Sequence, residues 1–254
     1  MYLRKVIYFF AVALFSLNST VVLAEDSPPA GIAITVYQVA PGMEASFEEV
    51  SAKFKAAADK IGSRPYAGYS TVFGNDGQYA FASPFSSFAE FKDQRNPLQE
   101  VYEGEELASI EKMYQESTTS TDSYVIVPRP DLGVAPPEFE SPREILLVIE
   151  VTVKTGMGQQ YQTFLKKLAE ATKAVSPDLY YSAFQPGIGS GPIWRFGIAM
   201  NWADLDTQGK TIPQRLMEHF GDRNGGKINE EGQEAVESVR FTVSRIRPDL
   251  THSN

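Results

Sequence analysis

The sequence contains no cysteine and only two histidines, His219 and His252. The lack of cysteine excludes disulfides, thiolate metal sites, cysteine nucleophiles and a lipid-modified N-terminal cysteine. Two histidines, one of them close to the C-terminus, are too few for a zinc site built on several imidazoles. Basic residues are outnumbered by acidic ones, 23 to 32, for a formal charge of −9. An acidic chain repels phosphate backbones, so no nucleic-acid partner is expected.

The N-terminus combines a basic start with a short apolar run. Arg4 and Lys5 precede the run at 6–17, and small residues ending in Ala24 precede the acidic Glu25. This order is typical of a cleavable secretory signal, because the run is shorter than the roughly 20 residues that span a bilayer. We therefore predict that residues 1–24 are removed, which moves the formal charge from −9 to −11 because two basic residues are lost. The mature protein would be periplasmic or extracellular, without stable membrane insertion; an uncleaved anchor is the alternative.

The tetrapeptide RPDL occurs twice, at 129–132 and at 247–250, and marks an internal repeat. Upstream of each copy, Gly42-Met43 recurs as Gly156-Met157. Apolar residues then match at helical spacing, which indicates one buried helix face in each copy. These pairs are Phe47/Tyr161, Val50/Phe164, Phe54/Leu168 and Ile61/Val175. Aromatic and apolar pairs continue the series in the same order: Tyr79/Phe196, Phe81/Ile198, Phe85/Trp202 and Phe88/Leu205.

Each copy is predicted to run strand, helix, strand, strand, helix, strand. The first copy has a strong turn, GNDG at 74–77, between its second and third strands. Its expected elements are 32–39, 43–61, 66–73, 78–82, a helical region 86–115 broken near Asn96-Pro97, and 124–127. Those of the second are 145–153, 159–175, 179–185, 193–200, helices within 203–237, and 239–245. The predicted units are 25–132 and 144–254, the latter with a C-terminal tail, joined by a Pro-rich linker at 133–143.

RPDL should mark the end of the fourth strand of each copy. Proline cannot donate a ladder hydrogen bond, so pairing is expected to stop there, with a salt bridge between the arginine and the aspartate. The alternative is two equivalent ligand sites that use Arg129 and Arg247.

Two βαββαβ units in tandem belong to the α+β class and form ferredoxin-like repeats. An antiparallel sheet with helices on one face needs cover for its other face, and the sheet of the second repeat can supply it. With the GM helix start and the SPFSSF and MNWADL stretches, this order resembles the dimeric α/β-barrel superfamily, which includes antibiotic-biosynthesis monooxygenase-like proteins. The resemblance covers almost all of the mature chain. It implies an intrachain barrel, or pseudo-dimer, with small ligands between sheet and helices.

Candidate site residues follow from this resemblance and from the differences between the two copies. The second copy alone has two tryptophans and an internal histidine, so we expect the main pocket there. Its candidate ligand-binding residues are Tyr181, Trp194, Arg195, Asn201, Trp202 and His219, and those of a second pocket in the first copy are Tyr69, Tyr79, Phe81 and Phe85. Core packing is the alternative for the aromatic residues, and a favourable place near a helix C-terminus is the alternative for His219.

Three functions remain open at the level of the sequence. The first is an exported protein that binds a small apolar or aromatic molecule, without a catalytic motif and without a metal or other cofactor. The second is a cofactor-independent monooxygenase-like enzyme that acts on an aromatic substrate. The third is a haem-binding protein with His219 as ligand. The glycine-rich stretch 187–191 lies between two predicted strands, so it indicates a lengthened hairpin turn and not a nucleotide loop. The outer helices leave oligomerisation open.

Overall fold

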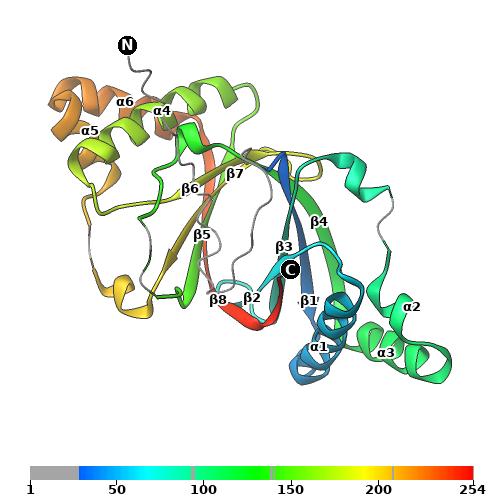
Figure 1. Cartoon of the computed structure of the whole chain (residues 1–254). Helices are drawn as coiled ribbons and strands as arrows, with labels where there is room; N and C mark the ends of the chain where they lie inside the picture. The colour runs from blue at the N-terminus through cyan, green and yellow to red at the C-terminus, as the bar shows by residue number, and fades with distance from the viewer. Residues whose placement is uncertain (1–28, 93–94, 138, 140, 208, 254) are drawn as a thin grey trace, which may run out of the picture.

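The computed structural model describes residues 29–92, 95–137, 139, 141–207 and 209–253. The predicted signal, residues 1–24, lies outside this range. Eight strands form one closed antiparallel barrel in the order β1-β3-β2-β8-β5-β7-β6-β4. The helices lie outside the barrel in two groups on opposite sides (Figure 1). Within the described residues, none of the helices has the length and apolar character needed to cross a membrane.

The first half of the chain supplies β1 to β4 and the helical group α1 to α3. The bounds are β1 Gly31–Val39, α1 Glu44–Ile61, β2 Tyr66–Phe73, β3 Gln78–Phe85, η1 Phe88–Phe91, α2 Pro97–Val101, α3 Gly104–Ser117, β4 Thr118–Pro128 and η2 Pro130–Leu132. The predicted break at Asn96-Pro97 is where α2 begins, with Asn96 as its N-cap. Strand β4 begins six residues earlier than predicted.

The second half repeats the order of elements with α4 to α6 as its helices. The bounds are β5 Ile145–Val153, α4 Gly158–Val175, β6 Ser182–Pro186, β7 Ile193–Met200, η3 Trp202–Asp206, α5 Ile212–Phe220, α6 Asp222–Glu234 and β8 Val236–His252. Strand β8 is much longer than the predicted 239–245. His252 is therefore the last residue of a strand and is 3% exposed. The prediction of a C-terminal tail around it is wrong, because His252 pairs with Tyr66 of β2.

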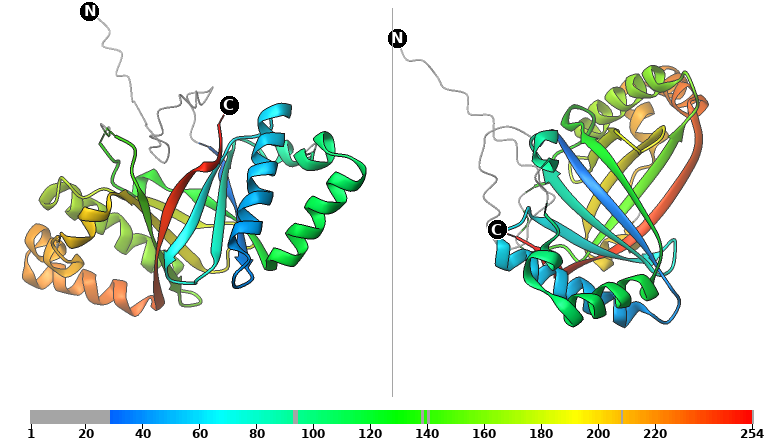
Figure 2. Two further views of the ribbon diagram at one scale, coloured as in Figure 1. Left: turned by 90° about the horizontal axis from the view of Figure 1, so that it is seen from below. Right: turned by 90° about the vertical axis from the view of Figure 1, so that its right-hand side faces the viewer.

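The two halves join at the edges of their sheets. Strand β2 pairs with β8, and β4 pairs with β6, both antiparallel. These two seams close the barrel, so the inner faces of both sheets are enclosed while the helices cover the outside (Figure 2). The sequence predicted that the two sheets would face each other. Hydrogen-bonded seams between the halves were not part of that prediction.

The repeated GM dipeptide has the same geometry in both halves. Gly42 and Gly156 have positive φ angles of 80° and 84°, which favour glycine. Met43 and Met157 then act as N-cap residues of α1 and α4, each 18 residues long. The matches read from the sequence along these helices therefore fall on equivalent positions.

The strand registers correct two of the residue pairs that the sequence matched between the copies. Tyr37 of β1 pairs with Tyr79, and the equivalent Val151 of β5 pairs with Trp194. Trp194 is therefore the counterpart of Tyr79, two residues away from the Phe196 that the sequence matched. Likewise, Phe88 and Trp202 are the first residues of η1 and η3, so the counterpart of Trp202 is Phe88 rather than Phe85.

The two RPDL segments hold the seams together. Arg129 donates two hydrogen bonds to Asp131, at 2.8 and 2.7 Å, and a third at 2.7 Å to Gln185 of the second half. Arg247 binds Asp249 in the same bidentate way, at 2.9 and 2.6 Å, and forms a salt bridge to Glu48 of the first half. The predicted arginine–aspartate salt bridge is confirmed in both copies.

The leucine of each RPDL segment packs into the opposite half. Leu132 is fully buried in the core around Tyr161 and Leu165, and Leu250 is 2% exposed in the core around Phe47 and Tyr79. The first segment ends β4 as predicted. The second does not end β8: residues 247–251 form a bulge, after which pairing with β2 resumes. A proline in a bulge interrupts the ladder without terminating the strand.

Candidate functional site

A cavity of about 1290 Å³ lies between the sheet of the first half and the helices that cover it. We call it the first-half cavity. Residues of β1, β3 and β4 line it on one side, and residues of α1, α2 and α3 line it on the other. Eight of the lining residues are aromatic: Tyr37, Phe47, Phe54, Tyr66, Phe81, Phe91, Tyr114 and Tyr124. Such a lining favours an apolar or aromatic ligand.

The aromatic rings form a connected group centred on Tyr37. Its ring centroid lies 5.4 Å from that of Phe47, 5.7 Å from Phe81 and 6.0 Å from Tyr114. The last two pairs are edge-to-face, an arrangement that the ring quadrupoles favour. Tyr66 extends the group, 5.7 Å from Phe81. Alternation along β1 and β3 places the side chains of Tyr37 and Phe81 on the helix-facing side of the sheet, where Phe47 of α1 and Tyr114 of α3 meet them.

Two tyrosines, Tyr66 (buried) and Tyr37 (partly buried), contribute hydroxyl groups to this lining. Tyr66 is 8% exposed, and its hydroxyl has no hydrogen-bond partner within the described residues. Burial raises the pKa of Tyr66, and the nearby Asp59 and Tyr37 add to the effect. Burial likewise raises the pKa of Tyr37 to about 12. Both groups are therefore neutral hydroxyls at neutral pH, able to donate a hydrogen bond to a ligand oxygen.

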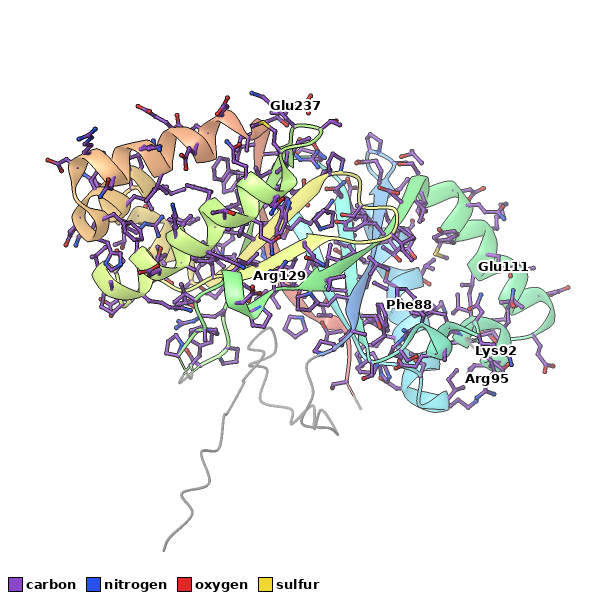
Figure 3. All side chains as sticks on the ribbon, turned by 90° about the horizontal axis from the view of Figure 1, so that it is seen from above. Phe88, Lys92, Arg95, Glu111, Arg129 and Glu237 are labelled. Atoms are coloured by element: carbon purple, nitrogen blue, oxygen red, sulfur yellow. The ribbon has the colours of Figure 1, made fainter. Side chains whose placement is uncertain are left out.

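The charged residues at the cavity balance one another. Arg64, Arg95, Glu90 and Glu111 line it. The guanidinium of Arg64 lies 4.2 Å from the centroid of the Phe91 ring, and Arg95 forms a salt bridge of 3.2 Å with Glu100. Arg95, labelled in Figure 3, comes from the segment before α2, and Glu111 comes from α3. Equal numbers of arginines and glutamates favour a ligand without a large net charge.

Two of the sequence-predicted residues, Tyr181 and Trp194, lie in the core of the second half. Both are 7% exposed. The Trp194 ring is 5.9 Å from that of Tyr161, and the Tyr181 ring is 6.0 Å from that of Phe196. The third predicted residue, Arg195, is 6% exposed and forms a salt bridge of 2.8 Å with Glu150. None of these residues lines the first-half cavity.

The other three predicted residues lie near the ends of elements. Asn201 precedes η3, and its backbone N–H donates to Asp204 at 2.8 Å. Trp202 makes an edge-to-face contact with Phe73 of the first half, with 6.3 Å between ring centroids. His219 contacts Glu170 of α4 at 3.2 Å. These residues also lie outside the first-half cavity, so a pocket formed by the six second-half residues stays a prediction.

Of the four residues predicted for the first half, Phe81 lines the cavity. Tyr69 pairs with Ala80 of β3. Ala80 points to the side opposite Tyr79 and Phe81, so Tyr69 also faces the barrel interior. Tyr79 donates a hydrogen bond of 2.7 Å to Glu48, and Phe85 packs on Phe88 and Phe91, at 4.9 and 5.0 Å. Tyr37 and Tyr66 were not singled out from the sequence.

Two glycines let helix α6 pack closely against its neighbours in the second half. A Cβ at Gly225 of α6 would lie 2.5 Å from the backbone of Leu216 in α5, and one at Gly232 would lie 2.3 Å from the Phe164 ring of α4. Helix α6 therefore packs directly against both neighbours. Helix α3 has no glycine after its first residue. Glycines inside a predicted helix are a sequence signal of such close packing between helices.

The comparisons with known proteins identify the fold. No family model and no curated protein matches the sequence. An anthrone oxidase-like protein has a TM-score of 0.55 at 12% identity, with 88% of this chain and 93% of that chain covered. A putative monooxygenase from Fusobacterium nucleatum has a TM-score of 0.54 at 9% identity, with 91% and 96% covered.

A chlorite dismutase from Candidatus Nitrospira defluvii, in complex with imidazole, has a TM-score of 0.52 at 8% identity, with 88% of this chain and 93% of that chain covered. At these identities the likeness is one of fold. The chain is an α+β protein with an eight-stranded antiparallel barrel, a fold that it shares with these proteins.

Proposed function

We propose that the protein is exported and binds a small, uncharged, apolar or aromatic molecule in the first-half cavity. The observation that carries this proposal is the cavity lining of eight aromatic residues around the unpartnered Tyr66 hydroxyl. The aromatic rings would surround the body of the ligand, and Tyr66 would donate a hydrogen bond to its oxygen. Export rests on the sequence pattern of residues 1–24. We also interpret the two halves as fused ferredoxin-like repeats, on the basis of their shared order of elements.

A second candidate function is cofactor-independent oxidation of the bound aromatic molecule. The names of two structural neighbours, an anthrone oxidase-like protein and a putative monooxygenase, support it only through a shared fold. The specific observation in its favour is the pair of neutral phenols, Tyr37 and Tyr66. They could hold a substrate hydroxyl or carbonyl in one orientation within an apolar site.

Haem binding in the first-half cavity does not fit the residues present. Neither histidine lines the cavity. Both ring nitrogens of His252 are already engaged, Nδ1 with Asp59 at 2.5 Å and Nε2 with the Ser63 carbonyl at 2.9 Å. His219 contacts Glu170 on the other half of the molecule. The described residues contain no group of three or more histidines, aspartates or glutamates placed to hold a metal ion. We therefore do not propose a haem function for this cavity.

The binding proposal can be tested by fluorescence titration with 2-naphthol and with unsubstituted naphthalene. Phe81→Ala should weaken the binding of both probes about 3- to 10-fold, because one face of the aromatic lining is lost. Tyr66→Phe should weaken 2-naphthol about 2- to 10-fold through the lost hydrogen bond and leave naphthalene unchanged. Phe241→Ala is the matched control, since Phe241 is 60% exposed and does not line the cavity. Binding that is absent, or unaffected by Phe81→Ala, would overturn the proposal.

A further inference from the structure

The glycine-rich segment 187–191 of the second half lies against the first half. It joins β6 to β7 and is longer than the corresponding turn between β2 and β3. Gly187 donates a backbone hydrogen bond of 3.0 Å to the carbonyl of Val125 in β4, and Val125 donates one of 2.8 Å to the carbonyl of Ile188. The segment thus continues the β4–β6 seam beyond the end of β6.

Two of its glycines are required by this close approach. A Cβ at Gly187 would lie 2.6 Å from the Val125 carbonyl oxygen, closer than real contacts allow. Gly189 has a φ of 74°, and a Cβ there would lie 3.0 Å from the carbonyl oxygen of Ser123. The glycines therefore allow the segment to lie flat on β4, which fixes the position of the residue between them.

A buried polar network holds the far end of the segment. Ser190 is 3% exposed and accepts a hydrogen bond of 2.5 Å from Nη1 of Arg195. Nε of Arg195 donates to Glu150 at 2.8 Å, and its guanidinium lies 4.1 Å from the centroid of the Tyr124 ring. Tyr124 itself lines the first-half cavity. The segment is thus anchored at both ends, at the seam and in this network.

Between the two anchors, Ile188 is an apolar side chain without cover. It lines the first-half cavity, next to Val125 and Ser123, although it belongs to the second half. It is nevertheless 69% exposed. A large aliphatic side chain held at the edge of an aromatic cavity, and left open to solvent, is placed to be covered when the cavity is filled.

We propose that Ile188 is a specificity-determining residue of the first-half cavity, through which the second half contacts ligands long enough to reach the edge of the cavity. This inference rests on the proposed binding function. Ser190 acts on the ligand only through the segment, and Arg195 acts through the segment and through Tyr124, so both are positioning residues. Ligands confined to the region around Tyr66 would not contact Ile188, whereas extended aromatic ligands would.

The test compares a short probe, 2-naphthol, with an extended uncharged one, N-phenyl-1-naphthylamine, on the full-length mature protein. Ile188→Ser should weaken N-phenyl-1-naphthylamine about 3- to 10-fold and change 2-naphthol by less than about 2-fold, because only the extended probe reaches the side chain. Ile188→Leu should bind both probes as the unchanged protein does. Ile212→Ser is the matched control, since Ile212 is 38% exposed on α5 and does not line the cavity. Because Ile188 is 69% exposed, Ile188→Ser should leave the fold intact, and circular dichroism checks this.

The outcomes separate the two proposals. If Phe81→Ala weakens both probes while Ile188→Ser weakens neither, the role of Ile188 is overturned and the binding function stands. Equal weakening of both probes by Ile188→Ser would also overturn the length-dependent role. If the unchanged protein binds neither probe, the binding function fails, and the role of Ile188 fails with it.

Discussion

At the scale of single residues, the unpartnered Tyr66 hydroxyl marks the first-half cavity as a candidate binding site. A core tyrosine usually finds a partner for its hydroxyl, because an unpaired buried polar group costs about 1–3 kcal/mol. Within the described residues, neither Tyr66 nor Tyr181 has such a partner, and of the two Tyr66 lines the first-half cavity. Other aromatic residues in the chain, such as Trp194 and Tyr161, fill the core of the second half by ring contacts. The Tyr66 hydroxyl is therefore the more informative feature of the site.

The raised pKa of Tyr37 predicts a loss of stability at high pH. Its folded pKa is about 12, against an ordinary value of 10.0, because burial disfavours the phenolate. A raised pKa contributes stability that is fully present below the ordinary value and is lost as the pH rises through the folded one. We expect the free energy of unfolding to fall between about pH 10 and pH 12, and to fall less in Tyr37→Phe. Urea titrations across this range measure the free energy of unfolding of both proteins, and phenolate absorbance follows the ionisation of the tyrosines. Equal losses of stability in the unchanged protein and in Tyr37→Phe would contradict the raised pKa of Tyr37.

At the scale of elements, the RPDL segments show how a repeat stabilises a fused barrel. Each arginine bonds its own aspartate and a residue of the opposite half, and each leucine enters the core of the opposite half. The alternative role of Arg129 and Arg247 as ligand groups is not supported, since neither lines the first-half cavity. Figure 3 shows Arg129 at the end of β4, on the side toward the second half.

Leu250→Ala should therefore destabilise the protein strongly. Leu250 is 2% exposed, and truncating a buried leucine leaves a void that costs about 2–5 kcal/mol. Leu205→Ala, at a position that is 40% exposed, should cost far less. Urea unfolding followed by circular dichroism gives both values. Equal, small effects would mean that the seam does not depend on the RPDL leucines.

The order of elements could be predicted from the sequence because it rests on local signals. Alternating strands, the GM helix starts and the turn at 74–77 are short-range patterns, and the structure has elements at these places. The full extent of β8 was missed, because a proline reads locally as a stop while the bulge at 247–251 depends on pairing with β2. A pocket was expected in the first half, and Phe81 of that prediction lines the cavity. Tyr37 and Tyr66 were not singled out, because which side chains meet in a cavity depends on how α1, α2 and α3 pack over the sheet.

At the scale of the whole molecule, the described cavity lies in the first of two similar halves. The barrel is closed by two seams, and helices cover both of its sides (Figure 2). In the second half, helices α4, α5 and α6 pack into a continuous core with Trp194 and Phe164. In the first half, a cavity of about 1290 Å³ remains under α1, α2 and α3. From its tryptophans and its histidine, the sequence led us to expect the main pocket in the second half, which stays a prediction, and a second pocket in the first half. The central claim is that the first half holds the ligand.

The most direct test of this claim is a crystal structure of the mature protein grown with 6-bromo-2-naphthol. The anomalous signal of bromine locates the bound molecule without assumptions about its orientation. We predict a bromine peak inside the first-half cavity, with the ligand hydroxyl within hydrogen-bond distance of Tyr66 Oη and with the peak absent or much weaker in Phe81→Ala crystals. A peak in the second half beside Trp194, Trp202 or His219, with none in the first-half cavity, would contradict the claim.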